Sequence, residues 1–308
     1  MTTELPFTGE RFIPGTPGEI WVEHWHRYHF ASRWAAGRRV LDVACGEGYG
    51  SALLARHAAS VVGVDIAQAA VDHARAAYSG VANLEFSCAP CTSLPLGDAT
   101  IDLAVSFETL EHIEAQERFL DELARVLDPE GVLLLSCPNK LEYSDKRDYH
   151  NEFHVRELYR DELAAMVAAR FPLSTWFAQR PTFFSVIAPE TPAGAHAQLV
   201  EVQEAHPAAA RETLSSPLYF IVAASRSREA LDAVVPALSV LADRDEWVYR
   251  DYAKVIRMLE HAAGDRDALK ADLAARELAL AEGQRELDRR RGWRWWLKLP
   301  LVRLGILR

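Results

Sequence analysis

The sequence predicts a doubly wound α/β domain with a mostly parallel sheet. Short apolar runs alternate with amphipathic segments from about residue 38 to residue 171. Strands that alternate with helices at this spacing form βαβ units, and such units build a parallel sheet. A glycine-rich turn also joins the first apolar run to the first amphipathic segment, as in folds that bind a ligand at the end of a strand.

The predicted elements follow one another in a regular order as far as Pro138. A helix opens the series over residues 19–37, where Gly37 is the expected stop signal. The predicted strands are RRVLDVAC (38–45), SVVGVDI (60–66), NLEFSCA (83–89), IDLAVSFE (101–108) and GVLLLSCP (131–138). The predicted helices are GSALLARHA (50–58), AAVDHARAAY (69–78) and AQERFLDELARVL (115–127), the last of which ends at the turn DPEG (128–131).

The chain after Pro138 extends this domain to about Ser225. A polar, aromatic and histidine-rich loop over 139–154 is followed by a predicted helix over 155–171. Two late strands, TFFSVIA (182–188) and LYFIVAAS (218–225), are expected to form a hairpin-like pair. This pair would complete a seven-stranded sheet with an antiparallel edge, so the predicted units are a cap segment over 1–37 and the α/β domain over 38–225.

Residues 226–291 predict a helical extension of a different kind. The chain is charged and rich in Ala and Leu from about residue 246, and it contains no proline before Pro300. Arg266, Arg276 and Gly283 interrupt the apolar seam that the heptads would form. We favour a coiled coil that joins copies of the chain, with a lone surface helix as the alternative. The seam residues in heptad register are Val255, Leu259, Ala262, Leu269, Leu273, Leu280 and Leu287.

Residues 292–308 form a basic tail that is rich in tryptophan. Together with the preceding arginines the stretch reads RRRGWRWWLKLPLVRLGILR. Tryptophan suits the headgroup boundary of a bilayer, and Arg or Lys suits anionic lipid. We therefore predict peripheral contact with the membrane surface, and the alternative is a tail that packs against protein.

The overall composition excludes several classes of protein. The formal net charge of −10 argues against a nucleic-acid binder, because such proteins present a broad basic face. The four cysteines suit reduced thiols in a cytosol better than a disulfide framework. No secretory segment opens the chain, and no apolar run is long enough to span a bilayer. We expect a cytoplasmic protein, peripheral on the cytoplasmic face of the inner membrane if the tail binds lipid.

The glycine-rich turn, VLDVACGEGYG (40–50), indicates which ligand it admits. Dinucleotide sites need the spacing G-x-G-x-x-G, whereas Gly46, Gly48 and Gly50 are spaced G-x-G-x-G. The carboxylate of Asp42 beside this turn would repel a phosphate but suits a cationic amine. Asp65, at the end of the next strand, can accept hydrogen bonds from ribose hydroxyls. This combination predicts S-adenosylmethionine, which carries an ammonium and a sulfonium, over NAD.

The chain from about residue 7 to residue 170 resembles class I S-adenosylmethionine-dependent methyltransferases. The resemblance lies in VLDVACGEGYG, in GVDI, in LP followed by IDLAVSFETLEHI, and in FLDELARVLDPEGVLLLSCPNK. It implies a Rossmann-like fold, S-adenosylmethionine as methyl donor and S-adenosylhomocysteine as product. The cofactor residues that it implies are Asp42, Ala44 and Gly46 at the methionine portion, Asp65 at the ribose, Ile66 at the adenine and Phe107 near the reacting methyl.

Two further parts of the cofactor site follow from the same resemblance. Many relatives have an acidic residue before LP that accepts from the adenine amino group, and Pro90 stands at this position here. Adenine selectivity would then depend on Cys91 or Thr92. The N-terminal helix covers the cofactor in the resembling enzymes, so Tyr28 is expected near the methionine carboxylate and Arg27 can pair with it.

The acceptor is suggested by the two ends of the domain. GERFIPG, HWHRYHFA, SCPNKLEYSD and HNEFHVREL resemble bacterial methyltransferases of surface-polysaccharide assembly, including O-antigen and exopolysaccharide types. This resemblance implies a glycan or sugar acceptor, in some cases a chain-terminating cap, and a glycosyltransferase partner. The alternatives are a small-molecule O- or C-methyltransferase, acting on a quinone precursor or secondary metabolite, and a non-catalytic scaffold.

Candidate residues for the acceptor side follow the fourth and fifth strands. A sugar hydroxyl needs a base to take its proton, and His112 and His154 are the candidates, whereas a phosphate acceptor needs none. The expected acceptor-binding residues are Glu108, Tyr143, Asp145 and Asn151. Glu108, Tyr143, Asp145 and His154 could hold a metal, but they lack metal-site spacing, and we predict no metal site.

Overall fold

A computed structural model describes residues 19–181, 202–203, 206–207, 214, 216–234, 238–241 and 247–306. The chain divides into two compact units, Met1–Arg244 and Asp245–Arg308. The predicted strand at 182–188 lies outside the described residues.

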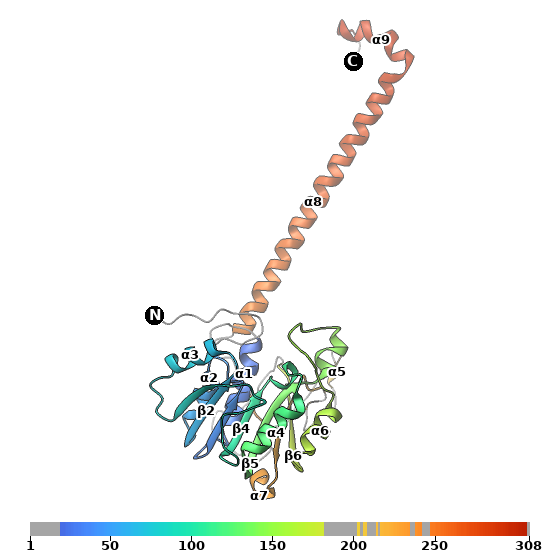
Figure 1. The fold of residues 1–308 in the computed structure, drawn as a ribbon. Coiled ribbons are helices and arrows are strands. Elements are labelled where there is room, and N and C mark those ends of the chain that lie inside the picture. The colour runs from blue at the N-terminus through green and yellow to red at the C-terminus, as the bar shows by residue number, and fades with distance from the viewer. Residues whose placement is uncertain are drawn as a thin grey trace, which may run out of the picture. The chain divides into compact units, whose positions relative to one another are not determined.

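The first unit is built on a seven-stranded sheet (Figure 1). Neighbouring strands follow the order β3-β2-β1-β4-β5-β9-β6, and the first five are parallel. β9 is antiparallel to both of its neighbours, so the predicted mostly parallel sheet is confirmed. The strands are β1 (Arg39–Val43), β2 (Ser60–Asp65), β3 (Leu84–Cys88), β4 (Ile101–Phe107), β5 (Leu127–Pro138), β6 (Leu173–Gln179) and β9 (Tyr219–Ser225), and a separate two-stranded sheet contains β7 (Val202–Gln203) and β8 (His206–Pro207).

Helices cover both faces of the sheet. Successive side chains of a strand point to opposite faces, so they belong to two different core clusters. Val40 belongs to one cluster and Leu41 to the other. On the first face lie α1 (Glu19–Ser32), α2 (Tyr49–Ala55), α3 (Gln68–Ala77) and α7 (Arg228–Asp232). On the second face lie α4 (Gln116–Val126) and α6 (Arg160–Ala168).

Several predicted boundaries were wrong. α1 ends at Ser32, before the expected stop at Gly37. β5 begins directly at Leu127, and the turn DPEG forms an irregularity inside this strand, where its pairing with β4 shifts register. α6 begins only at Arg160, because Tyr159 and Glu162 form a capping box there.

Three short helices complete the loops at the site. The 3-10 helix η1 (Leu110–His112) follows β4, while α5 (Lys140–Tyr143) and the 3-10 helix η2 (Asp145–Arg147) follow β5. Residues 155 and 156, which were predicted to be helical, instead donate their backbone N–H groups to the Glu111 carbonyl, at 2.8 and 3.0 Å. The loop after β5 is thereby fastened to the turn after β4.

The second unit consists of α8 (Trp247–Arg291) and α9 (Trp293–Arg303). The predicted extension started at residue 226, but Leu231 and Val234 are buried in a core cluster of the first unit, which therefore reaches beyond Ser225. Among the described residues, no helix has the length and apolar character needed to cross a bilayer. The seven predicted seam residues of α8 are all exposed in the single chain.

Candidate active site at the carboxyl ends of the strands

The glycine-rich turn after β1 lies where the order of the parallel strands reverses, between β1 and β4. Ligands of open α/β sheets bind at this switch point, outside the carboxyl ends of the strands. The backbone there is left-handed at Ala44 (φ 60°), Gly46 (φ 56°) and Gly48 (φ 92°). Glu108, just after β4, has φ 52°. Non-glycine residues in this conformation are strained and collect at functional sites.

Asp65 fastens the glycine-rich turn to the end of β2. One carboxylate oxygen accepts the Gly46 N–H at 2.9 Å, and the other accepts the Ala67 N–H at 2.9 Å. Asp65 is only 6% exposed. Asp65, which is predicted to bind the ribose, therefore also orders the turn through these two hydrogen bonds. The sequence did not indicate this second role.

Asp42 is fully buried beneath the turn. It accepts hydrogen bonds from Ser51 Oγ at 2.6 Å and from Tyr28 Oη at 3.0 Å. Burial raises the pKa of the Asp42 carboxyl from 3.8 to about 7, against the hydrogen bonds from Ser51 and Tyr28. Asp42 thus makes these hydrogen bonds within the chain, and its place at the methionine portion stays a prediction.

Gly50 explains why the turn departs from the dinucleotide spacing. A Cβ at this position would lie 2.1 Å from Cζ of Tyr28. The third glycine therefore leaves space for the Tyr28 ring, which also meets Phe107 edge to face with centroids 5.2 Å apart. Tyr28 and Phe107, both predicted at the methionine end of the cofactor, are thus buried in contact with each other.

Arg27 is buried at the centre of a polar network that the sequence did not predict. Its Nε donates to Gln179 Oε1 at 2.7 Å, and its guanidinium lies 4.4 Å from the centroid of the Tyr219 ring. Its Nη2 is 3.6 Å from Glu108 Oε1. Neither Nη1 nor Nη2 has a hydrogen-bond partner among the described residues. Two unpartnered donors on a buried cation suit an anionic group such as a carboxylate.

The predicted adenine side offers apolar surface. Ile66 directly follows β2 and is 73% exposed. Cys91 is half-buried, and burial raises the pKa of its thiol to about 11. The Thr92 carbonyl accepts a hydrogen bond from Arg118 at 3.1 Å. The exposed aliphatic side chain of Ile66 provides a surface that a flat ring can cover.

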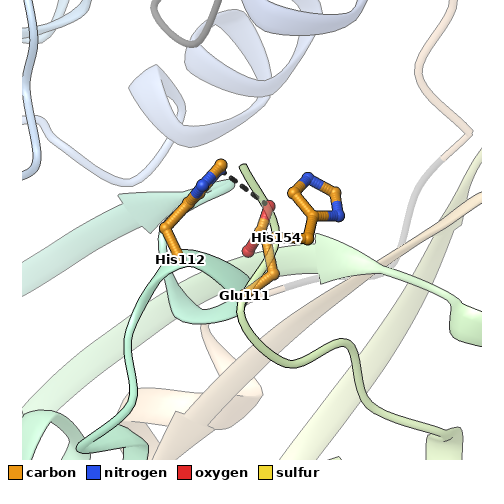
Figure 2. A group of neighbouring side chains, drawn as sticks. All are labelled: Glu111, His112 and His154. Atoms are coloured by element: carbon orange, nitrogen blue, oxygen red, sulfur yellow. Dashed lines mark ion pairs between the residues drawn. The ribbon is translucent and has the colours of Figure 1, made fainter. Parts of the chain in front are cut away.

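On the acceptor side, His112 and His154 meet Glu111 (Figure 2). His112 Nδ1 is 2.8 Å from the Phe153 carbonyl and must donate to it, which leaves Nε2 with a lone pair. This Nε2 is 3.9 Å from Glu111 Oε1. The His154 ring lies edge to face with the His112 ring at a centroid distance of 4.9 Å.

His154 differs from His112 because both of its ring nitrogens are engaged. Its Nδ1 is 2.6 Å from Glu157 Oε1, and its Nε2 is 3.0 Å from Asn151 Nδ2. Burial lowers the pKa of His154, so the neutral ring is favoured at neutral pH. Of the two predicted bases, His112 is therefore the one whose ring nitrogen can receive a proton directly.

Glu111 is the main site residue that sequence analysis missed. It is 2% exposed, and its Oε2 has no hydrogen-bond partner among the described residues. Burial, and then the charge of Glu108, raise the pKa of Glu111 well above its usual range. The available signal was its position next to His112, in the turn that follows β4.

The predicted acceptor residues divide into two groups. Tyr143 stacks on His154 with centroids 5.5 Å apart, and Asn151 contacts His154 as described, so both belong to the cluster. Glu108 accepts a hydrogen bond from Ser136 Oγ at 2.6 Å at the end of β4. Asp145 instead pairs with Lys140 Nζ at 2.6 Å and accepts a hydrogen bond from the Tyr159 hydroxyl.

Residues 41–135, which include the glycine-rich turn and η1, match the family described as "Methyltransferase domain". This part of the chain is therefore similar to methyltransferase domains. The predicted class I fold and the predicted cofactor are thereby confirmed. Within this region the turn at Gly46 is the predicted cofactor side of the site.

Curated relatives share this methyltransferase domain. A "Probable S-adenosylmethionine-dependent methyltransferase" of Mycolicibacterium smegmatis is 42% identical over 174 residues, which are 54% of this chain and 65% of the relative. A protein of Mycobacterium tuberculosis with the same description is 42% identical over 170 residues, or 53% of this chain and 60% of the relative. The chain thus spans between 60% and 65% of these relatives.

More distant matches include a curated protein and a solved structure. A "Ubiquinone biosynthesis O-methyltransferase" of Coxiella burnetii is 33% identical over 105 residues, which are 34% of this chain and 45% of that protein. The crystal structure of the YcgJ protein from Bacillus subtilis aligns with a TM-score of 0.48 at 21% identity, covering 66% of this chain and all of that one.

Proposed function

We propose that this protein transfers a methyl group from S-adenosylmethionine to a sugar hydroxyl of a bacterial surface glycan. The observation that carries the proposal is the accessible Nε2 of His112, next to a carboxylate at the same sheet edge as the glycine-rich turn. A hydroxyl beside this nitrogen can give up its proton as the new O–C bond forms. The rest of the rate comes from alignment of donor and acceptor and exclusion of water.

The charges around His112 favour a hydroxyl over a phosphate acceptor. Glu111 is within 3.9 Å of His112, and Glu157 is within 2.6 Å of His154. The charge of Glu108 raises the pKa values of Glu111 and His154. Acidic side chains at this edge disfavour a phosphate dianion, and their oxygens can accept hydrogen bonds from sugar hydroxyls.

Aromatic rings beside the cluster support a sugar ring as the acceptor. Tyr143 lies 5.7 Å from Tyr149 and 5.8 Å from Tyr219 between ring centroids. Tyrosine offers an apolar face together with a hydroxyl, and a sugar offers the same combination. The resemblance of the flanking loops to surface-polysaccharide methyltransferases agrees with this choice, and a glycosyltransferase that builds the glycan is the partner that it implies.

A quinone precursor or another small molecule is the second candidate acceptor. The observation in its favour is the name of the Coxiella burnetii relative, a ubiquinone biosynthesis O-methyltransferase. The test is to incubate the purified chain with methyl-labelled S-adenosylmethionine and either extracted surface glycan or catechol-type phenols. We expect label in the glycan only, and turnover of phenols alone would contradict the glycan proposal.

His112→Ala tests the acceptor side of the proposal. We expect the turnover number to fall by about a hundredfold or more, which is the usual contribution of a positioned acid–base group. The affinity for S-adenosylmethionine should stay the same, because His112 follows β4 and is not part of the glycine-rich turn. Full activity in this variant would remove His112 from the mechanism.

We further propose that the second unit joins copies of the chain and holds them at the inner membrane. The exposed seam of α8 supports self-association, because apolar side chains in heptad register bury one another in a coiled coil. For the tail, Trp296 and Leu297 are both about two thirds exposed, and Lys298 and Arg303 lie beside them in α9. This mixture suits the headgroup region of anionic lipid.

A further inference from the structure

The cluster of Glu111, His112 and His154 has the composition of a metal site. One ligand atom from each residue lies within 4.8 Å of the other two (Figure 2). We propose that these three side chains bind a divalent transition-metal cation that also holds the acceptor hydroxyl. The inference deepens the proposed function and depends on it for the identity of the acceptor. It differs from the expectation from the sequence, which was that the chain has no metal site.

Hydrogen bonds orient both imidazoles for metal binding. The Phe153 carbonyl holds Nδ1 of His112, and the Glu157 carboxylate holds Nδ1 of His154. Metal-binding histidines almost always donate one ring N–H to a carboxylate or a backbone carbonyl, which turns the other nitrogen toward the metal. Here Nε2 of each ring is the remaining ligand atom. A cation on His154 would displace the Asn151 amide, which contacts this Nε2 at 3.0 Å.

The backbone brings the ligands together before any cation binds. Glu111 and His112 are neighbours in η1, and His154 comes from the loop after β5. The Glu111 carbonyl accepts the N–H groups of Val155 and Arg156, the two residues that follow His154. These hydrogen bonds fix the loop against η1, so the ligand set does not have to be gathered from separate segments during binding.

The buried carboxylate gives an independent reason for a cation. Oε2 of Glu111 is buried and has no hydrogen-bond partner among the described residues. A buried polar oxygen without a partner is costly, so such a group calls for a cation or a hydrogen-bond donor. The charge of Arg27 acts on Glu111, but among the described residues its side-chain hydrogen bond goes to Gln179 and its ion pair to Glu108 is 3.6 Å long.

The ligand types select the class of cation and the chemistry. Two imidazole nitrogens and one carboxylate favour Mn²⁺, Fe²⁺, Co²⁺ or Zn²⁺ over Mg²⁺ and Ca²⁺, which prefer oxygen. Three protein ligands leave open positions for the acceptor, as in catalytic sites. The cation lowers the pKa of the bound hydroxyl, which releases its proton to solvent. The oxygen lone pair then forms the O–CH₃ bond, and the S–CH₃ bonding pair stays on sulfur, which leaves S-adenosylhomocysteine.

When the cation is bound, Nε2 of His112 acts through the cation, and its role as a base in the proposed function applies to the chain without a cation. The two roles are separated by binding measurements that need no acceptor. The full chain is stripped with a chelator and titrated with Mn²⁺, with free Mn²⁺ followed by electron paramagnetic resonance. We expect one site per chain in the wild type and at least tenfold weaker binding in Glu111→Gln and His112→Gln.

Glu117→Gln is the matched control, because Glu117 is an exposed residue of α4 that pairs with Arg170. This variant should bind Mn²⁺ like the wild type, and calorimetry with S-adenosylmethionine should show that all variants are folded. Equal Mn²⁺ binding by Glu111→Gln and the wild type, or none by either, would overturn the metal site.

The acceptor assay separates this inference from the proposed function. Full methylation of glycan by the stripped enzyme in excess chelator would overturn the metal role and leave the glycan proposal standing. One-site Mn²⁺ binding that is lost in Glu111→Gln, together with no label in glycan, would support the metal site and overturn the proposed acceptor.

Discussion

Asp42 and Glu111 are both buried carboxylates, but only Asp42 has its oxygens satisfied within the chain. Asp42 accepts from Ser51 and Tyr28, whereas Oε2 of Glu111 accepts from no described group. The position of Asp42 just before the glycines led to the prediction that its carboxylate favours a cationic ligand. The sequence could not predict that Tyr28, 14 positions earlier, covers it, because this contact depends on how α1 packs on the sheet.

Asp42→Asn tests the buried carboxyl at the residue scale. The pKa of Asp42 is raised by burial to about 7 in the folded chain, so the native state binds its proton more tightly than the unfolded chain. The contribution of Asp42 to stability is therefore fully present below pH 3.8 and is lost as pH rises to about 7. We expect the free energy of unfolding of the wild type to fall by on the order of a few kcal/mol relative to Asp42→Asn over this range.

The measurement is urea unfolding of both proteins at half-unit steps between pH 4 and pH 8. The difference between the two curves isolates Asp42 from the other titrating groups. A constant difference across the range would mean that Asp42 keeps an ordinary pKa, and the account of its burial would be wrong.

At the scale of elements, the strands with long apolar runs were predicted, as was the edge strand β3, whereas the other edge strand, β6, was not. β1, β2, β4 and β5 are buried on both faces, so their sequences are continuous apolar runs. β6 has the sequence LSTWFAQ and is mostly half-exposed, as an edge strand often is, so it lacks that signal. The same limit applied to the residues of the candidate site. Residues that directly follow buried strands were predicted, but Gln179 and Tyr219, at the ends of β6 and β9, were not.

Gly50→Ala tests the packing of α1 against α2. A Cβ at residue 50 would lie 2.1 Å from the Tyr28 ring, so the ring has to move and its hydrogen bond to Asp42 is lost. We expect the free energy of unfolding to fall by about 1–3 kcal/mol, as for other overpacked cores, and S-adenosylmethionine binding to weaken. Denaturant unfolding and calorimetry measure the two effects.

Gly80→Ala is the control, since a Cβ there meets no atom within 4 Å. This variant should keep the stability and cofactor affinity of the wild type. If Gly50→Ala also kept the stability and cofactor affinity of the wild type, the close packing of Tyr28 against Gly50 would be wrong.

For the whole molecule, composition alone separated the chain into an α/β unit and a helical unit. The boundary was placed too early, at Ser225, because α7 is a helix that belongs to the first unit. A short buried helix after the last strand resembles the start of a helical extension in sequence. The difference lies in Leu231 and Val234, whose burial depends on the sheet beside them.

Deletion of residues 292–308 tests the second unit. We expect the shortened chain to lose binding to vesicles that contain anionic lipid, because it lacks the tryptophans and basic residues of α9. Its affinity for S-adenosylmethionine should not change, since the cofactor site lies in the first unit. Vesicle sedimentation measures the first property, and neutral vesicles are the control. Equal sedimentation of the two forms with anionic vesicles would exclude a membrane role for the tail.

The central claim is that a positively charged methyl donor occupies the turn at Gly46, next to Asp65 and above Asp42. Titration calorimetry of the full chain with S-adenosylmethionine, and separately with NAD⁺, tests it most directly. We predict one saturable site for S-adenosylmethionine, binding at least tenfold weaker in Asp65→Ala, and no heat from NAD⁺. No binding of S-adenosylmethionine, or saturable binding of NAD⁺, would contradict it.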